Sequence, residues 1–146
     1  MRLIKPVLYV ALVVLATVPM YPVADSTARL TVSVDNVNDT GGNIGVFLFR
    51  DSKGWPESKE KAFRWLVVPA HPGVVVVEVA DLPPGRYAVA VGHDSNVNHR
   101  VDKNWFGKPT EQWGMSNNPH ASLKAPDFSK AVFELTTNKE IRVHLQ

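Results

Sequence analysis

Apolar and polar residues alternate with a period of two where the patterned part of the chain begins. From Leu30 to Asp35 (LTVSVD) every second residue is apolar. Successive side chains of a strand point to opposite faces of a sheet, so this pattern predicts a strand with one buried face. The next segment, Asp35 to Asn43 (DNVNDTGGN), is rich in residues that favour turns. It therefore predicts a hairpin loop.

Three further runs follow the strand pattern. Ile44 to Phe49 is apolar on both faces and predicts a central strand, and Trp65 to Pro69 and Val74 to Val79 are rich in β-branched residues. Between the first two of these runs, the segment from Pro56 to Arg64 predicts one or two helical turns. The order of these runs indicates a protein built mainly of strands.

The segment DLPPGRYAVAVGHD predicts a turn followed by a strand. Pro84 presets φ for the second turn position, and Gly85 is expected to supply the positive φ of a type II turn. The strand then covers Arg86 to Val91. Tyr87 follows the turn directly, so its hydroxyl is predicted to bond back to the backbone, as in the tyrosine corner of β-sandwiches.

The last two runs, Ala131 to Thr136 and Ile141 to Leu145, are separated by a turn signal that predicts another hairpin. About seven short strands and almost no helix predict an all-β fold, an antiparallel β-sandwich. Residues 93 to 130 lack periodicity. This irregular loop of about 38 residues far exceeds the length at which a loop usually has a functional reason.

The first residues resemble a secretory signal peptide. Arg2 and Lys5 precede an apolar run from Val7 to Val18. That run is shorter than the ~20 residues of a membrane-spanning helix. We therefore expect residues 1–24 to be a signal peptide and residues 25–146 to form a single β-sandwich domain, periplasmic or secreted, with no membrane insertion after cleavage.

Cleavage after Ala24 or Ala16 would remove Arg2 and Lys5, which account for the formal net charge of +2. The remaining domain is electrically balanced, which gives no electrostatic case for binding nucleic acid or an anionic membrane surface. The chain has no cysteine. Disulfides, thiolate metal sites and a cysteine nucleophile are therefore excluded.

The stretch HDSNVNHRVD, residues 93 to 102, carries a candidate calcium loop. Such loops place oxygen ligands at their first, third and fifth positions, which here are Asp94, Asn96 and Asn98. Arg100 offers its backbone carbonyl at the seventh position. Asp102, at the ninth, can bind calcium directly or through water.

Two departures weaken this match to a calcium loop. The sixth position, usually glycine, is His99, and the twelfth, where a bidentate glutamate closes an EF-hand, is Trp105. Closure would have to come from Glu111, Asn104 or another loop, so only weak affinity is expected. The alternative is that the Asx side chains bond their own backbone in successive turns, with no metal.

Three aromatic residues of the long loop are Trp105, Phe106 and Trp113. They could form an exposed ligand surface for a sugar or a peptide. They could equally form a small core that pins the loop to the sandwich, and we favour this role because ordering so long a loop without anchors would cost too much entropy.

Motifs typical of catalysis are absent from the sequence: there is no serine elbow, no HExxH and no glycine-rich phosphate loop. We therefore expect an exported, non-catalytic binding or structural module whose partner is an envelope protein or a glycan. The alternative is a small periplasmic hydrolase or isomerase using His93, Asp94 and Glu111, and it requires these three side chains to converge in one pocket.

Three segments together resemble a family of secreted bacterial proteins described as domain of unknown function 2141. They are LFRDSKGWPESKEKAFRWLVVPA (48 to 70), DLPPGRYAVAVGHDSNVNHRVDKNWFGKPTEQWGMSNN (81 to 118) and APDFSKAVFEL (125 to 135). The resemblance covers essentially the whole of the expected mature domain. It implies a transthyretin-like or immunoglobulin-like sandwich and export, but no reaction.

The resemblance also bears on the Asx residues. Members often carry HDxNxNGxxD, which Asp94, Asn96, Asn98 and Asp102 match, while His99 replaces the glycine. Calcium, the one cofactor expected here, is thereby put in doubt. Asn117 and Asn118 match the SNN of the family, and we expect them to hold the return path of the loop through bonds from side chain to backbone. Hydroxyisourate hydrolase has a related sandwich, but its motifs are not found here, and fold alone does not imply its activity.

Overall fold

The computed structural model describes residues 27–38, 41–99, 102–104, 109–120 and 124–146. The expected signal peptide lies outside these ranges, as do Arg100, Trp105 and Phe106. Within the described ranges, no helix is long and apolar enough to cross a membrane.

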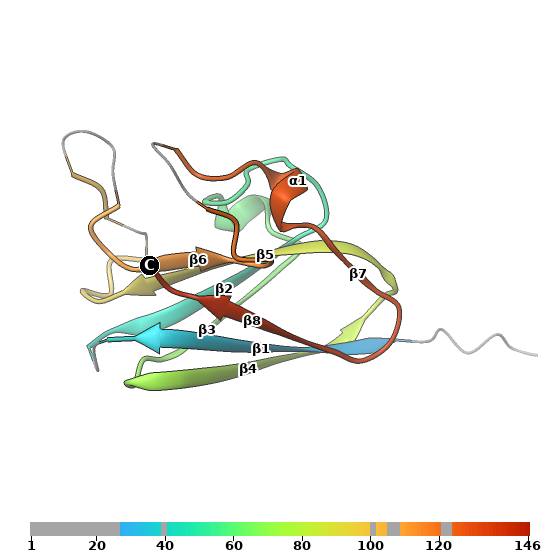
Figure 1. Cartoon of the computed structure of the whole chain (residues 1–146), viewed down its shortest axis with the longest axis horizontal. Coiled ribbons are helices and arrows are strands. Elements are labelled where there is room, and N and C mark those ends of the chain that lie inside the picture. Colours follow the sequence, from blue (N-terminus) through green and yellow to red (C-terminus); the bar gives the residue numbers. More distant parts are fainter. Residues whose placement is uncertain (1–26, 39–40, 100–101, 105–108, 121–123) are drawn as a thin grey trace, which may run out of the picture.

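The described strands form two sheets, which lie one over the other in Figure 1. The three-stranded sheet has the order β4 (Gly73–Leu82), β1 (Ala28–Val37), β8 (Lys139–His144). The five-stranded sheet has the order β3 (Arg64–Pro69), β2 (Asn43–Phe49), β5 (Gly85–Asp94), β6 (Trp113–Met115), and β7 (Phe133–Leu135) also pairs with β5. Two short helical elements are η1 (Lys59–Lys61) and α1 (Phe128–Ala131). The predicted all-β sandwich is confirmed, and η1 lies where a helical turn was predicted.

The core between the sheets is formed by alternate residues of the long strands. β1 contributes Leu30, Val32 and Val34, whose exposed fractions are all 0%. The facing sheet contributes alternate residues of β2 and β5, namely Ile44, Val46, Leu48, Tyr87, Val89 and Val91. Each fully buried aliphatic side chain contributes about 1.5–3 kcal/mol to folding, which makes this core the main source of stability.

The two predicted hairpins are wrong. β1 and β2 belong to different sheets, so the turn-rich segment between them carries the chain from one sheet to the other. Likewise β7 pairs with β5, whereas β8 pairs with β1. Turn residues permit the chain to reverse, but the need of each strand to bury its apolar face decides which partner it takes.

β1 and β8 pair in parallel, with Leu30 opposite Lys139 and Asp35 opposite His144. The other described strand pairs are antiparallel. Parallel strands need a long crossover, and here the rest of the sandwich lies between them in the sequence.

The tyrosine corner is confirmed. The side chain of Tyr87 is fully buried, and its hydroxyl donates a hydrogen bond of 2.6 Å to the carbonyl of Pro83. The predicted type II turn is wrong, because Gly85 is not among the described residues with positive φ. Gly85 is already paired with Leu135 in the sheet, and the left-handed residue is Asp81, with φ 55°.

A second core lies on the other face of the five-stranded sheet. Its buried members are Ala88, Met115 and Ala131, and partly buried Trp55, Trp113, Ala125, Phe128 and Val132 pack against them. Trp55 packs edge to face against Phe49 and Phe128, with ring centroids 5.3 and 5.7 Å apart. Its Nε1 donates to the carbonyl of Pro126 at 2.9 Å. Part of the long segment predicted to be irregular is therefore folded as β6 and α1 onto this face.

Among the described residues, backbone hydrogen bonds join the two sheets along one side. The backbones of Trp113 and Gln146 exchange hydrogen bonds of 3.3 and 3.0 Å, which connect β6 to the residues that follow β8. Gly114 permits this approach, since a Cβ there would lie 2.6 Å from the carbonyl oxygen of His144. On the opposite side, β3 and β4 are edge strands.

Candidate functional site

The candidate site begins at the end of β5, where Asp94 pairs with Asn43 of β2. Gly42, before β2, takes φ +74°, and a Cβ there would lie 1.9 Å from the carbonyl oxygen of Asp94. Only glycine fits this approach. The chain that crosses between the sheets therefore packs directly on the first residue of the site.

Asp94 accepts two backbone hydrogen bonds. Its Oδ1 accepts from the N–H of Asn98 at 2.9 Å and its Oδ2 from the N–H of His99 at 2.7 Å. Asn96 Oδ1 also accepts from the N–H of Asn98, at 3.1 Å. Val97 and His99 take φ 60° and 67°, so His99 adopts the conformation for which glycine is usual, at a cost of about 1 kcal/mol.

Asp102 accepts hydrogen bonds from the side chains of Asn96 and Asn98. Its Oδ2 accepts from Asn96 Nδ2 at 2.7 Å, and its Oδ1 accepts from Asn98 Nδ2 at 2.8 Å. The structure thus brings Asp94, Asn96, Asn98 and Asp102 together in one hydrogen-bonded group. We call these four residues, with Ser95, Val97 and His99, the Asx loop.

Glu111 bridges the two ends of the Asx loop. Its Oε1 accepts from the N–H and the hydroxyl of Ser95 at 2.9 and 2.6 Å, and its Oε2 accepts from the N–H of Asp102 at 3.0 Å. The N–H of Thr110 in turn donates to the carbonyl of Asp102 at 2.8 Å. Glu111 therefore closes the loop by joining its two ends.

Calcium binding would require a rearrangement of the Asx loop. Asp94 and Asp102 carry the hard carboxylate oxygens that calcium prefers. Asn96 and Asn98, however, turn their amide nitrogens toward Asp102. Calcium would require both amides to rotate so that their oxygens face Asp102. Among the described residues, His, Asp and Glu side chains form no group of three that could hold a metal.

The three residues of the enzyme alternative have separate surroundings. His93 is 3% exposed and donates from Nε2 to the carbonyl of Gly41 at 2.7 Å. Asp94 is the next residue of the same strand, so its side chain points to the opposite face. Glu111 is bonded to Ser95 and Asp102. These contacts do not favour the convergence that the alternative requires.

Trp113, of the three candidate aromatic residues, is partly buried and packs in the second core. This contact supports the anchoring role over an exposed ligand surface. The other two, Trp105 and Phe106, lie outside the described residues.

Asn117 and Asn118 hold the return path of the chain, as predicted. Asn117 Nδ2 donates to the carbonyls of Lys130 and Val132 at 3.2 and 2.9 Å. Asn118 Nδ2 donates to the carbonyl of Arg142 at 3.1 Å, and its Oδ1 accepts from the N–H of His144 at 2.8 Å. Both residues take positive φ, 64° and 45°. The segment after β6 is thereby attached to both α1 and β8.

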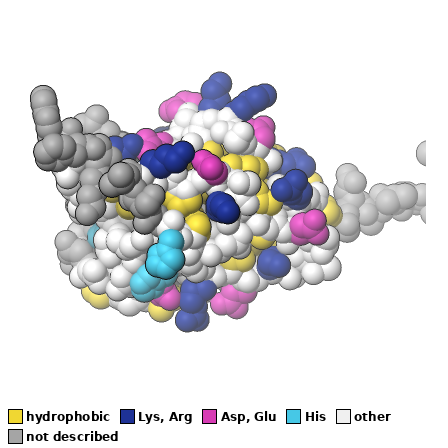
Figure 2. Space-filling model, turned by 45° about the horizontal axis from the view of Figure 1, so that its top comes forward, with side chains coloured by type: hydrophobic (Ala, Val, Ile, Leu, Met, Phe, Trp, Pro, Cys, Tyr) yellow, Lys and Arg dark blue, Asp and Glu magenta, His cyan; other side chains and the backbone are white. Residues whose placement is uncertain are grey.

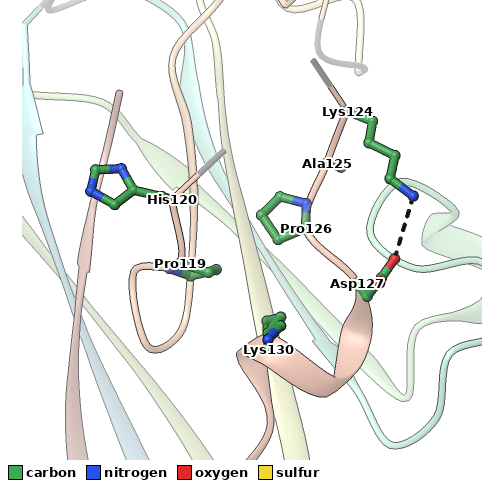
Figure 3. Close-up of a pocket in the computed structure, with 7 residues that line it drawn as sticks. All are labelled: Pro119, His120, Lys124, Ala125, Pro126, Asp127 and Lys130. Atoms are coloured by element: carbon green, nitrogen blue, oxygen red, sulfur yellow. Dashed lines mark ion pairs between the residues drawn. The ribbon is translucent and has the colours of Figure 1, made fainter. Parts of the chain in front are cut away.

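A surface hollow that the sequence did not predict lies beside α1. Its volume is about 440 Å³, and it is lined by Pro119, His120, Lys124, Ala125, Pro126, Asp127 and Lys130 (Figure 3). Lys124 and Asp127 form an ion pair of 3.9 Å at its rim. The face of the molecule drawn in Figure 2 likewise mixes basic and acidic side chains. The hollow therefore presents no single sign of charge.

Comparison with known proteins identifies a family. The model of the family described as "Uncharacterized protein conserved in bacteria (DUF2141)" matches residues 32–143. The chain belongs to this family. The match covers the sandwich from β1 to β8 and includes the whole Asx loop, as the sequence resemblance predicted. Neither the curated proteins nor the solved structures contain a match.

Proposed function

We propose that the chain is an exported, non-catalytic β-sandwich module whose Asx loop is a pre-ordered binding surface. The observation that carries this proposal is the double bridge of Glu111, which bonds Ser95 and Asp102 at the two ends of the loop. A loop that is already ordered pays little further entropy when it binds a partner. An envelope protein or a glycan is the partner class that this polar, hydrogen-bonding surface suits.

Calcium would reinforce the same surface. The charges of Asp94 and Asp102, with the amide oxygens of Asn96 and Asn98, supply the oxygen ligands that calcium prefers. With only two carboxylates, the expected dissociation constant is about 10⁻⁴ to 10⁻³ M, typical of extracellular modules. A cation would replace the bonds from the amide nitrogens to Asp102 by coordination.

Export is supported by the charged and apolar pattern of the first residues. The full chain, expressed in a bacterium, should appear outside the cytoplasm. N-terminal sequencing of that product should find a start after Ala24 or Ala16. Retention of the intact chain inside the cell would contradict the export part.

Calcium titration tests the metal part. In millimolar calcium the wild-type chain should release or take up heat, and its melting temperature should rise relative to chelator, because a ligand that binds only the folded state stabilises it. Asp102→Asn should abolish both effects. Asp127→Asn removes one carboxylate at the surface hollow and should keep them. No heat and no melting shift at millimolar calcium would refute the metal part.

Binding itself is tested on a glycan array in calcium and in chelator. We expect retention of a subset of glycans by the wild-type chain and its loss in Glu111→Gln, which removes one arm of the bridge. Equal retention by both proteins would show that the Asx loop is not the binding surface.

A further inference from the structure

At the end of β5 opposite Asp94, two arginines lie against one aromatic ring. The guanidinium carbon of Arg50 lies 5.2 Å from the ring centroid of Phe63 and 5.5 Å from that of Tyr87. The guanidinium carbon of Arg64 lies 5.9 Å from the same Phe63 centroid. We call Arg50, Phe63 and Arg64 the arginine surface. Stacking on a ring fixes the plane of a guanidinium before any ligand arrives.

The arginine surface is accessible, and its charge is not neutralised. Phe63 is 40% exposed, and Arg50 is exposed. Among the described Asp and Glu side chains, none forms an ion pair with Arg50 or Arg64. Arg64 Nη1 donates to the carbonyl of Ala80 at 2.5 Å, which leaves its other N–H groups for a ligand. Two oriented cations on an exposed apolar ring are complementary to a ligand that carries both carboxylates and apolar groups.

An open strand edge starts at this surface. β3 begins at Arg64 and is the edge strand of its sheet. Trp65 and Val67, on its outward face, are 44% and 45% exposed. The Nζ of Lys59, from η1, lies 4.0 Å from the ring centroid of Trp65, so a third cation lies beside β3. An edge strand offers unpaired backbone groups, and exposed apolar residues at alternate positions match the side chains of an added strand.

We propose that the arginine surface and the edge of β3 bind an extended, acidic segment of a partner protein. The segment adds to β3 through backbone hydrogen bonds, its carboxylates bind Arg50 and Arg64, and its apolar side chains pack on Phe63, Trp65 and Val67. Alternation of acidic and apolar residues is the pattern that this surface selects. The site is separate from the Asx loop and does not depend on calcium.

Selection from a library of short displayed peptides on the full-length chain tests the chemistry. Enriched sequences should alternate Asp or Glu with Val, Ile or Phe. The most enriched peptide, labelled with a fluorophore, should then bind the wild-type chain in an anisotropy titration. Enrichment of basic or purely apolar sequences would overturn the proposal.

Matched variants locate the site. Arg50→Gln and Arg64→Gln should each weaken binding of that peptide about tenfold or more, because a bidentate contact to a carboxylate is lost. Arg29→Gln removes the same charge from β1 in the other sheet, where Arg29 pairs with Glu78 at 3.6 Å, and should leave binding unchanged. Equal losses in all three variants would show general charge attraction and overturn the proposal. Circular dichroism melting confirms that each variant is folded.

Two further measurements test whether a membrane or a second copy of the chain binds this site instead. Tighter binding to phosphatidylglycerol vesicles than to the selected peptide would assign the arginine surface to a membrane. Dimerisation of the wild-type chain in sedimentation, abolished by Arg50→Gln, would assign the β3 edge to a second copy. Either result would overturn the proposed acidic segment.

Discussion

The Asx loop and the second core both attach irregular chain to the five-stranded sheet, but they do so by different physics. In the Asx loop, carboxylates accept hydrogen bonds from backbone N–H groups and amides, and the side chains of Asn96 and Asn98 are exposed. In the second core, Trp55 packs its ring against Phe49 and Phe128 around buried Ala88 and Ala131. The first arrangement rests on polar contacts, whereas the second rests on packing.

The Asx loop and the second core therefore contribute differently to stability. Hydrogen bonds of exposed groups contribute little net stability, because water competes for the same donors and acceptors. Burial of aromatic surface contributes more and is indifferent to salt. The second core therefore contributes more to anchoring the segment than the Asx loop does.

Trp55→Ala should have the largest effect. It removes two ring contacts and the hydrogen bond from Nε1 to the carbonyl of Pro126. We expect a loss of about 3 kcal/mol in the free energy of unfolding, measured in urea. Trp65→Ala, on the exposed face of β3, is the matched control and should cost less than about 1 kcal/mol. Similar losses for both tryptophans would show that the second core does not anchor the segment.

Glu111→Gln should have an intermediate effect. The amide retains one acceptor oxygen, so either Ser95 or Asp102 loses its partner. We expect a loss of about 1 kcal/mol in the free energy of unfolding, together with faster hydrogen exchange of the Asp102 N–H. Glu134→Gln, at the exposed position of β7, is the control. Unchanged exchange at Asp102 would mean that Glu111 does not hold the loop.

Glu60→Gln should have the smallest effect, since Glu60 bonds only within its own turn. The pKa of Glu60 is lowered, first by the hydrogen bond from its own backbone N–H and then by the Ser58 hydroxyl. A lowered pKa in the folded state contributes stability above the unfolded value near 4.5, and this is lost as pH falls through the folded pKa. The melting difference between wild type and variant should therefore be small at pH 7 and vanish in acid. A difference that grows in acid would contradict this.

Sequence patterns predicted the strands better than their partners. Period-two alternation located β1 because its apolar face packs in the core. The turn residues located β5, and Tyr87 signalled the corner through its place after that turn. The predictions of hairpins were wrong because Asn, Asp and Gly indicate that the chain can reverse direction. They do not indicate which strand the next strand pairs with. β6 was missed because its three residues are too few to display a period.

The candidate site was predicted in part. The spacing of Asp94, Asn96 and Asn98 indicated a shared loop, and Glu111 was among the residues considered for its closure. Its bond to Ser95 was not foreseen, because the two residues are far apart in the sequence and share no motif. The arginine surface was missed for the same reason: Arg50, Phe63 and Tyr87 meet only after three strands have assembled.

The parallel pairing of β1 with β8 sets the timing of folding. The first strand cannot complete its sheet until the last one has been synthesised, since the hydrogen bond from Asn36 to the carbonyl of Leu145 spans 109 residues. Contacts this distant in sequence require a large loop to close before they contribute stability, so folding should take milliseconds to seconds. A nascent chain of this protein thus cannot complete its three-stranded sheet until β8 has been synthesised.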